Sequence, residues 1–422
     1  MVHAANGYHG ISQTGDAEAS FDISEIFFSR TDARGKILSG NTVFQRISQY
    51  AWDELLGRPH NVIRHADIPR GVFWLLWERL RNGLATGAYI KNRAKDGRCY
   101  WVYAIITPIE AGFLSVRIKP SSALLQTIEA EYSTLLRAEN ANELSPAESG
   151  QMLLKRLHEI GFADYPSFMT QALVSEFNAR EFSLSRNNDQ PMAHFEALME
   201  SAGTLIRVAG SIADGYRSHQ FVPLNLVVQA GRLGHAGSAI GTISTNFSLI
   251  SEEIRKGLMS FVEAATQVAA TIGEGAFLLG TAQIQQEAAA LFDAERKQAE
   301  VDHRQEMALL CAQQELYQAE ALKKLLGIKH EIENFYRQTS EMKRLASGLS
   351  AIRVMGKVES GRLSIEVLDD LIADLEAFQQ TVAAGLAEIT SINQDLRQNA
   401  AKLMGSPRER VKGSGRVNLR SC

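Results

Sequence analysis

Short runs rich in β-branched and aromatic residues, separated by polar turn sequences, fill the first 120 residues of the chain. The runs are IFFSRTD, YIKNRAKDG, CYWVYAIITPI and FLSVRIKP, and the turn sequences include DARG, KDG and EAG. Runs of this length and composition are typical of strands. They predict a small α+β domain at residues 21–121, after a flexible N-terminus at 1–20.

Beyond residue 121 the chain is rich in Ala, Leu, Gln and Glu, which favours helices. Interrupted helical segments predict a connector at 122–190, and longer runs predict an antiparallel helical bundle or coiled coil at 191–405. Two seams of apolar residues at heptad-like spacing are too long to be satisfied within one helix, so they must pack on each other or on another chain. The seams are Leu325, Ile328, Ile332, Phe335, Met342, Leu349 and Leu368, Leu371, Leu375, Phe378, Val382, Leu386, Ile389, Ile392, Leu396.

Composition narrows the classes of function. With 44 basic and 48 acidic residues the net charge is −4, so no electrostatic footprint for nucleic acid is present. Three widely separated cysteines without a CxxC pair fit a reducing compartment and argue against structural zinc. The start lacks the blocks of a signal peptide and no run of about 18 apolar residues occurs, so we expect a cytoplasmic protein. Residues 406–422 read as a disordered basic tail.

The N-terminal runs carry a family resemblance. The stretch GNTVFQRISQYAWDELLGRPHNVIRHADIPRGVFWLLWERLRNG, with YIKNRAKDGRCYWVYAIITPI and LSVRIKP, closely resembles the PAS domain of bacterial aerotaxis receptors. Its most specific pieces are GRPHNVIRHADIP and KNRAKDGRCYW. The resemblance implies a curved five-stranded antiparallel sheet with helices closing one face over an apolar cavity. In the family that cavity holds FAD, and the redox state of the flavin is the signal.

Arg64, His65 and Asp67 supply a cation, a switchable donor and an acceptor within four residues. They match the Arg-His-x-Asp motif that the resembling family needs for flavin binding. From the residues alone, a local ion pair of Arg64 with Asp67 and an ordinary loop histidine are equally open. Haem is the alternative cofactor, because related receptors use haem-binding PAS domains, and His65 is then the axial ligand to test.

Three further residues complete the implied site. Trp77 matches an aromatic side chain that lines the same region, and Asn41 and Asn92 match family asparagines that could bond the edge of the ring. Asn41 is also consistent with a turn residue after a glycine. Two positions depart from the family pattern, because Ala66 replaces its proline and Thr86 replaces a tryptophan.

The run LNLVVQAGRLGHAGSAIGTIS at 224–244 resembles the signalling tip of methyl-accepting chemoreceptors. In those receptors the tip binds a histidine kinase and its coupling protein, which are therefore the implied partners. Two family glutamates are replaced here, by Gln229 and His235, so a helical hairpin with a diverged partner remains an open alternative. The candidate partner-binding residues are Asn225, Gln229, Arg232, Gly234 and His235.

A faint repeat at a shift of 125 residues lays 349–363 over 224–238 and predicts hairpin tips near 231–237 and 355–361. One chain would then form a four-helix bundle alone, as a monomeric pseudo-dimer, with both tips at the same end; a dimer through the PAS domain is the alternative. The stretch TAQIQQEAAA fits the receptor methylation pattern and nominates Gln285 and Gln286 as modification sites.

No catalytic signature accompanies these regions. A GGDEF-like run and a Gly-rich ATP lid are missing from the sequence, and no Ser-His-Asp or Cys-His arrangement can be argued. We therefore predict a non-enzymatic redox or oxygen sensor for energy taxis, which uses FAD in its PAS domain and signals through its helices to chemotaxis-type partners. The alternatives are a haem-based gas sensor and a helical adaptor that senses nothing.

Overall fold

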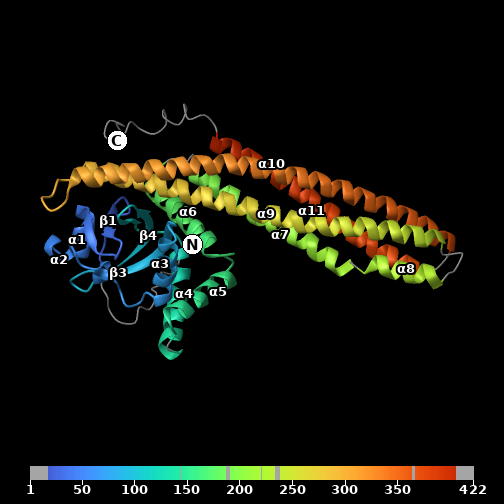
Figure 1. The fold of residues 1–422 in the computed structure, drawn as a ribbon, viewed down its shortest axis with the longest axis horizontal. Helices are drawn as coiled ribbons and strands as arrows, with labels where there is room; N and C mark the ends of the chain where they lie inside the picture. The colour runs from blue at the N-terminus through green and yellow to red at the C-terminus, as the bar shows by residue number, and fades with distance from the viewer. Residues whose placement is uncertain are drawn as a thin grey trace, which may run out of the picture. The chain divides into compact units, whose positions relative to one another are not determined.

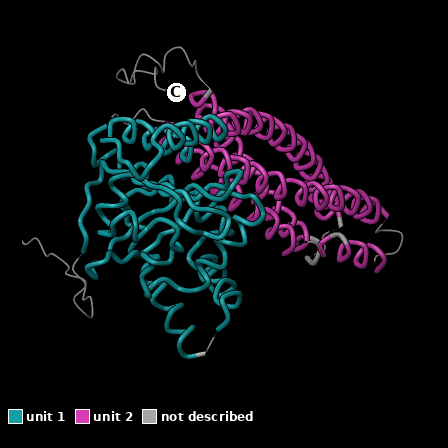
Figure 2. Tube along the Cα trace, turned by 60° about the vertical axis from the view of Figure 1, so that its left-hand side comes forward, with its two compact units in different colours: residues 1–188, 280–317, 419–422 teal, residues 189–279, 318–418 magenta. Residues whose placement is uncertain are grey.

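The computed structural model of the chain is drawn as a ribbon in Figure 1. It divides into two compact units, which Figure 2 colours separately. Unit 1 takes the described residues up to 188 together with 280–317, and unit 2 takes those of 189–279 and 318–418. The residues that the structure describes are 18–142, 144–186, 191–219, 221–232, 238–363 and 366–404.

Five strands of unit 1 form an antiparallel sheet in the order β2-β1-β5-β4-β3. The first and last strands of the chain pair in the middle of this order, with Ile26 opposite Ile118. The sheet and its helices confirm the predicted α+β class. The strands are β1 (Ile26–Asp32), β2 (Ile37–Gly40), β3 (Thr86–Arg93), β4 (Cys99–Ile109) and β5 (Gly112–Ile118).

The helices between β2 and β3 cover one face of the sheet (Figure 1). Phe44 stacks on Phe27 of β1 with 6.2 Å between ring centroids, and Trp77 meets Phe113 of β5 edge-on at 5.4 Å. We call this the inner face. The helices are α1 (Thr42–Ser48), α2 (Trp52–Leu55), the 3-10 helix η1 (His60–Ile63) and α3 (Arg70–Arg81).

Helical segments that follow the sheet in sequence cover its other, outer face. The hydroxyl of Tyr89 on β3 donates to Glu176 Oε1 of α6 at 2.7 Å. On β1, Phe28 meets Phe292 of α9 edge-on at 5.0 Å. The outer face is therefore buried by the chain itself. The predicted connector consists of α4 (Leu124–Asn142), α5 (Pro146–Glu159) and α6 (Tyr165–Ser183).

The connector packs tightly on the α/β part of unit 1. A Cβ added at Gly71 of α3 would lie 2.5 Å from the backbone nitrogen of Gly150 on α5, so this close approach requires glycine. Glu139 of α4 accepts hydrogen bonds from the N–H groups of Arg70 (2.8 Å) and Gly71 (3.3 Å). These are the first two residues of α3, whose N–H groups have no partner within the helix.

In unit 2, four helical rows of one chain pack around a shared core. Phe261 of α9 stacks on Phe335 of α10 at 4.7 Å, Tyr216 of α7 meets Phe378 of α11 at 5.9 Å, and the Tyr216 hydroxyl lies 3.2 Å from Ser251 Oγ of α9. The chain thus supplies all four rows, as the single-chain bundle requires. The helices are α7 (Pro191–His219), α8 (Val222–Arg232), α9 (Ser238–Asp293), α10 (His303–Leu363) and α11 (Glu366–Met404).

The two apolar seams form much of this core. The seam residues from Leu325 to Leu349 and those from Leu371 to Leu396 are buried. Their spacing therefore predicted correctly which face of α10 and α11 turns inward.

The structure bears differently on the two predicted hairpin tips, at 231–237 and 355–361. α8 ends at Arg232 and α9 begins at Ser238, so the first tip lies largely in 233–237, outside the described residues. The second prediction is wrong in position, because 355–361 belong to α10, which continues to Leu363. Gly356 serves packing rather than a turn, since a Cβ there would lie 3.6 Å from Ile372 and 4.0 Å from Ile243. The start of α9 therefore lies beside the end of α10.

Other predicted boundaries can also be compared with the structure. Residues 280–317, which we placed in the bundle, belong to unit 1, because they bury the outer face of the sheet. The N-terminus up to residue 17 and the basic tail at 406–422 lie outside the described residues.

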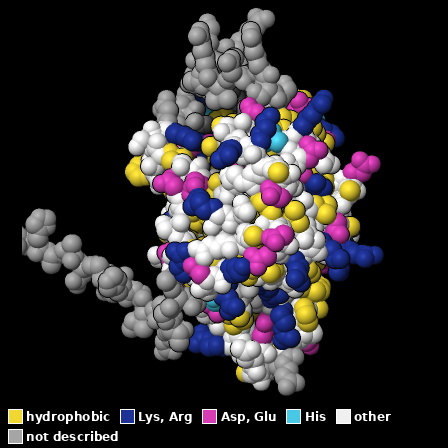
Figure 3. All heavy atoms as spheres, turned by 90° about the vertical axis from the view of Figure 1, so that its left-hand side faces the viewer, with side chains coloured by type: hydrophobic (Ala, Val, Ile, Leu, Met, Phe, Trp, Pro, Cys, Tyr) yellow, Lys and Arg dark blue, Asp and Glu magenta, His cyan; other side chains and the backbone are white. Residues whose placement is uncertain are grey.

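No helix in the described part of the chain combines the length and the apolar character needed to cross a membrane. On the face drawn in Figure 3, acidic and basic side chains are interspersed, as the nearly balanced composition leads one to expect.

Candidate functional site

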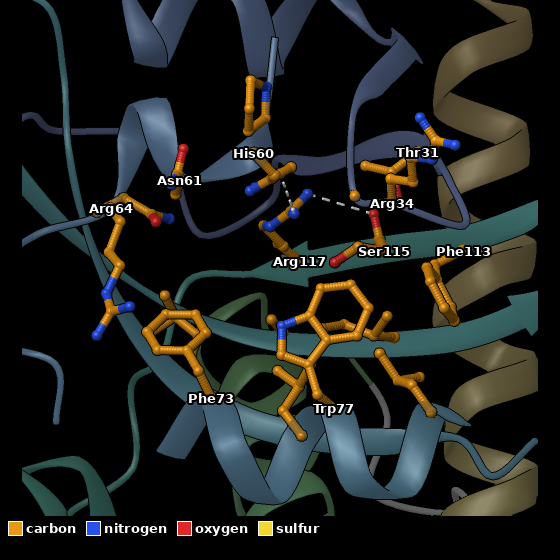
Figure 4. Close-up of a pocket in the computed structure, with 18 residues that line it drawn as sticks. Thr31, Arg34, His60, Asn61, Arg64, Phe73, Trp77, Phe113, Ser115 and Arg117 are labelled. Carbon is orange, nitrogen blue, oxygen red and sulfur yellow. Dashed lines mark hydrogen bonds between the residues drawn. The ribbon is translucent and has the colours of Figure 1, made fainter. Parts of the chain in front are cut away.

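A cavity of about 290 Å³ lies in unit 1 between α3 and the inner face of the sheet (Figure 4). α3 presents apolar side chains at helical spacing, and the sheet presents a mixture of apolar and polar ones. A volume of this order matches the smaller sites for cofactors and other small molecules. The lining residues are Thr31, Arg34, Gly35, Pro59, His60, Asn61, Arg64, Phe73, Leu76, Trp77, Leu80, Ile90, Asn92, Ala104, Ile106, Phe113, Ser115 and Arg117.

Two buried polar atoms in the cavity wall lack a protein partner. Asn92 Nδ2 on β3 and Ser115 Oγ on β5 make no hydrogen bond within the described part of the chain. Their residues are 3% and 5% exposed, so bulk water does not satisfy them either. Buried polar groups are nearly always paired, and leaving one unpaired costs about 1–3 kcal/mol. The sheet side of the cavity therefore offers hydrogen bonds to a ligand.

Arg117 places a buried cation in the same wall. Its guanidinium donates to Ser29 Oγ at 3.0 Å and to His60 Nε2 at 2.7 Å, and Figure 4 shows it between His60 and Ser115. Burial lowers the pKa of Arg117 to about 10, so the side chain stays charged at neutral pH. Within the described residues no carboxylate pairs with it. The cavity wall is thus positively charged at β5.

His60 is the neutral partner of this cation. Burial first, and the charge of Arg117 second, lower the pKa of His60 to about 3. A lowered pKa disfavours the protonated ring, so His60 is neutral at physiological pH and its Nε2 accepts the bond from Arg117. Neither residue was singled out from the sequence. A charged residue within the apolar run FLSVRIKP was the available signal for Arg117.

The rim of the cavity carries further cations. The Arg64 guanidinium lies 3.9 Å from the centroid of the Phe73 ring, and burial lowers its pKa. Arg34, in the turn after β1, is exposed. The same turn contains Gly35 at a φ of 76°, where a Cβ would lie 3.4 Å from the Trp77 ring. The turn therefore closes against α3 and brings Arg34 to the rim.

Three of the six predicted flavin residues line the cavity, and the other three, His65, Asp67 and Asn41, do not. Arg64, Trp77 and Asn92 are in its wall. His65 is buried outside it, where its Nδ1 accepts from the Asp67 backbone N–H at 3.1 Å. Asp67 pairs with Lys91 Nζ of β3 at 2.6 Å and forms no ion pair with Arg64. The loop that holds the motif is therefore fastened to β3, at Lys91 through Asp67 and at Asn92 through the backbone of Arg64.

Asn41 has a structural place away from the cavity. Its Oδ1 accepts from the N–H groups of Phe28 and Phe44, both at 3.2 Å, and so caps α1. Its Nδ2 donates to Ile26 O at 3.1 Å and to Glu295 Oε1 at 2.9 Å. All its hydrogen-bonding capacity is used, which corrects the expectation that it bonds the edge of a ring. The alternative that the sequence left open, in which Asn41 is a turn residue after Gly40, agrees better with these contacts.

The two candidate modification sites differ in access. Gln285 is 1% exposed, and its Nε2 donates to Thr107 Oγ1 of β4 at 3.3 Å. A modifying enzyme cannot reach a side chain held against the sheet in this way, so the prediction for Gln285 is wrong for this conformation. Gln286, the next residue of α9, is exposed.

The candidate partner-binding residues lie on or next to α8. Asn225 and Arg232 are exposed and Gln229 is half-buried, and the neighbouring Leu224 is 59% exposed. Gly234 and His235 lie outside the described residues. The described part of the tip is therefore accessible to another protein.

No protein-family model matches the chain. The aerotaxis receptor of Escherichia coli (strain K12) is 34% identical over 112 residues, which are 25% of this chain and 22% of that protein. The biofilm dispersion protein BdlA of Pseudomonas aeruginosa is 23% identical over 286 residues, 59% of this chain and 66% of that protein. The nitrogen fixation regulatory protein of Klebsiella pneumoniae is 29% identical over 86 residues, 20% and 17% of the two chains.

The chain carries a PAS sensor domain joined to a chemoreceptor-like helical region. This confirms the resemblance of both regions that was drawn from the sequence. Its matches span about a fifth of the aerotaxis receptor, two thirds of BdlA and a sixth of the nitrogen fixation regulator.

Solved structures similar to this PAS domain include the PAS domain of a protein from Colwellia psychrerythraea, which is 21% identical and covers 22% of this chain and 85% of that one at a TM-score of 0.20. The light-state structure of the blue-light photoreceptor Aureochrome1 LOV is 22% identical and covers 27% and 90% of the two chains at a TM-score of 0.21.

Proposed function

We propose that the PAS domain binds FAD in the cavity and that the redox state of the flavin is the signal it passes to the helices. The observation that carries the proposal is the pair of unpartnered polar atoms, Asn92 Nδ2 and Ser115 Oγ, facing the aromatic wall at Trp77. A flavin ring is flat and apolar on its faces and forms hydrogen bonds along its edge. The aromatic wall at Trp77 suits the apolar faces of the ring, and the polar atoms of Asn92 and Ser115 suit its hydrogen-bonding edge.

Each part of the cavity would hold a different part of the cofactor. Trp77 and Phe73 would cover a face of the ring, and Asn92 and Ser115 would bond its edge. Arg64 at the rim would meet the phosphates. When bound, a flavin supplies a centre that accepts and returns electrons. The protein itself orients the ring, excludes water and keeps a fixed positive charge beside it.

The geometry favours flavin over haem. His65, the axial ligand that the sequence nominated, is not in the cavity wall. His60 is in the wall, but its Nε2 already contacts Arg117 at 2.7 Å and Ser29 at 3.1 Å. An adaptor with an unused cavity is also disfavoured, because it would carry the cost of two unpaired buried groups in its resting state. In this proposal the chain is a receptor and not an enzyme.

The proposal predicts a flavin absorbance spectrum for the full-length protein after incubation with FAD. Asn92→Ala should weaken FAD binding about tenfold, since a hydrogen bond in a buried site contributes about 1–1.5 kcal/mol. Asn82→Ala removes the same group from an exposed position after α3 and should leave the affinity unchanged. Flavin fluorescence quenching measures both. A Soret band would show that the cofactor is haem and not flavin. A protein that takes up neither cofactor would favour the alternative of a helical adaptor that senses nothing.

We further propose that the exposed end of α8 transmits the signal to a chemotaxis histidine kinase and its coupling protein. The support is the accessible Asn225 and Arg232 within a run that resembles a receptor tip. Arg232→Glu should abolish capture of the coupling protein in a pull-down, because it inverts the charge at the centre of the surface. Arg337→Glu, on the exposed side of α10, is the matched control. Failure of the unmodified protein to capture the coupling protein would point to a diverged partner.

A further inference from the structure

Strand β1 separates the cavity from the segment that turns between α9 and α10. Its side chains alternate between the two faces of the sheet, as in any strand. Ser29 and Thr31 point inward, where Ser29 accepts from Arg117 and Thr31 lines the cavity. Phe28 and Arg30 point outward, to Phe292 and to Glu306 of α10. Adjacent residues of one strand thus contact the two sites.

Two carboxylates fasten the α9–α10 turn, residues 292–306, to the PAS domain, Glu306 at β1 and Glu295 at the start of α1. Glu306 is 1% exposed and accepts from Arg30 Nε through both oxygens, at 2.9 and 3.1 Å. Glu295 accepts from Asn41 Nδ2 and from the backbone N–H of Thr42, both at 2.9 Å. A buried carboxylate that loses its partner is strongly unfavourable, so the contact of Arg30 with Glu306 responds steeply to small displacements of the sheet.

The β1–β2 pairing has an irregularity at the same place. The register shifts between Arg30 and Thr31, where Ser39 pairs with Arg30 but Ile37 pairs with Thr31. The extra residue, Leu38, is on β2, so the ladder between the two strands is interrupted beside Arg30 and Thr31. Thr31 at the cavity and Arg30 at the carboxylate are the two residues that flank it. A small change of the strand at this point therefore acts on both.

We propose that β1 couples the cavity to the α9–α10 turn, so that a ligand in the cavity changes how firmly Arg30 holds Glu306. The inference rests on the proposed flavin function for the identity of the ligand, and it names the route by which the helices receive the signal. Because coupling between two sites is reciprocal, it makes a linked prediction. If FAD weakens the contact of Arg30 with Glu306, then a substitution that removes this contact must raise the affinity for FAD by the same factor. If FAD strengthens the contact, the same substitution must lower the affinity.

The experiment combines two measurements on the full-length chain. Hydrogen–deuterium exchange with and without FAD reports on residues 292–306, and fluorescence quenching gives the FAD affinity of the unmodified protein, Glu306→Gln and Glu315→Gln. Glu315 is an exposed glutamate on the same helix and serves as the control. We expect FAD to change exchange in the turn, and Glu306→Gln to change the affinity by about fivefold or more in the linked direction. Glu315→Gln should match the unmodified protein.

Glu295→Gln gives the same test at a half-buried position, should Glu306→Gln fold poorly. FAD that binds without altering exchange in the turn, with affinities unchanged in both variants, would overturn the coupling and leave the flavin site standing. Changes of unlinked sign would also overturn it. Absence of FAD binding by the unmodified protein would overturn the flavin function itself and the coupling with it.

Discussion

Phe292→Ala is expected to lower the free energy of unfolding of unit 1 by about 3 kcal/mol or more, the usual cost of removing a buried phenylalanine side chain. Phe292 is 3% exposed, meets Phe28 edge-on at 5.0 Å and stacks on His303 at 4.3 Å. Its loss would leave a gap between the α9–α10 turn and the outer face of the sheet. Urea denaturation followed by tryptophan fluorescence measures the change.

Tryptophan fluorescence is specific for unit 1, because all four tryptophans lie in residues 52–101. The matched control is Phe182→Ala on α6, where the side chain is 77% exposed and should contribute less than about 0.5 kcal/mol. Limited proteolysis should in addition cut Phe292→Ala faster than the control within 294–302. Equal urea midpoints for the two variants would mean that the turn does not rest on the sheet.

Glu176→Ala is the second change with a large expected effect. The fully buried carboxylate of α6 accepts four hydrogen bonds, from the N–H groups of Ser121 (2.5 Å) and Ser122 (2.9 Å), from Ser122 Oγ (2.6 Å) and from the Tyr89 hydroxyl (2.7 Å). Burial raises the pKa of Tyr89, which keeps this hydroxyl a donor. Alanine would leave these donors without an acceptor, at about 1–3 kcal/mol each where water cannot replace it. We expect a loss of about 3 kcal/mol or more.

Ser121 and Ser122 join the last strand of the sheet to α4, so Glu176 holds this junction through their N–H groups. Tyr89→Phe removes one of the four bonds and should cost about 1 kcal/mol. Glu129→Ala, at an exposed position of α4, should be neutral within about 0.5 kcal/mol. The same fluorescence-detected denaturation orders the three variants. A Glu176→Ala protein as stable as Glu129→Ala would show that the carboxylate does not hold this junction.

Local patterns in the sequence were sufficient for the elements. The runs rich in β-branched and aromatic residues became β1, β3, β4 and β5, because such side chains fit a pleated, buried surface. The seam at Leu375 and Phe378 became the buried stripe of α11, because helical spacing places those side chains on one face. Of the residues that the sequence nominated for a site, Arg64, Trp77 and Asn92 line the cavity.

Tertiary structure decided which surface each buried face meets. Spacing shows that a side chain is buried but not by what, so Asn41 could not be linked to Glu295, 254 positions away, nor Gln285 to Thr107. His60 and Arg117 become a pair only when η1 closes over β5.

The PAS domain and the helical character of the rest were thus determined by the sequence itself, because periodicity and local motifs record them directly. The composition of the cavity wall and the return of residues 280–317 to the outer face of the sheet were decided by tertiary structure. Both depend on contacts between residues far apart in the chain, and such contacts leave no local pattern.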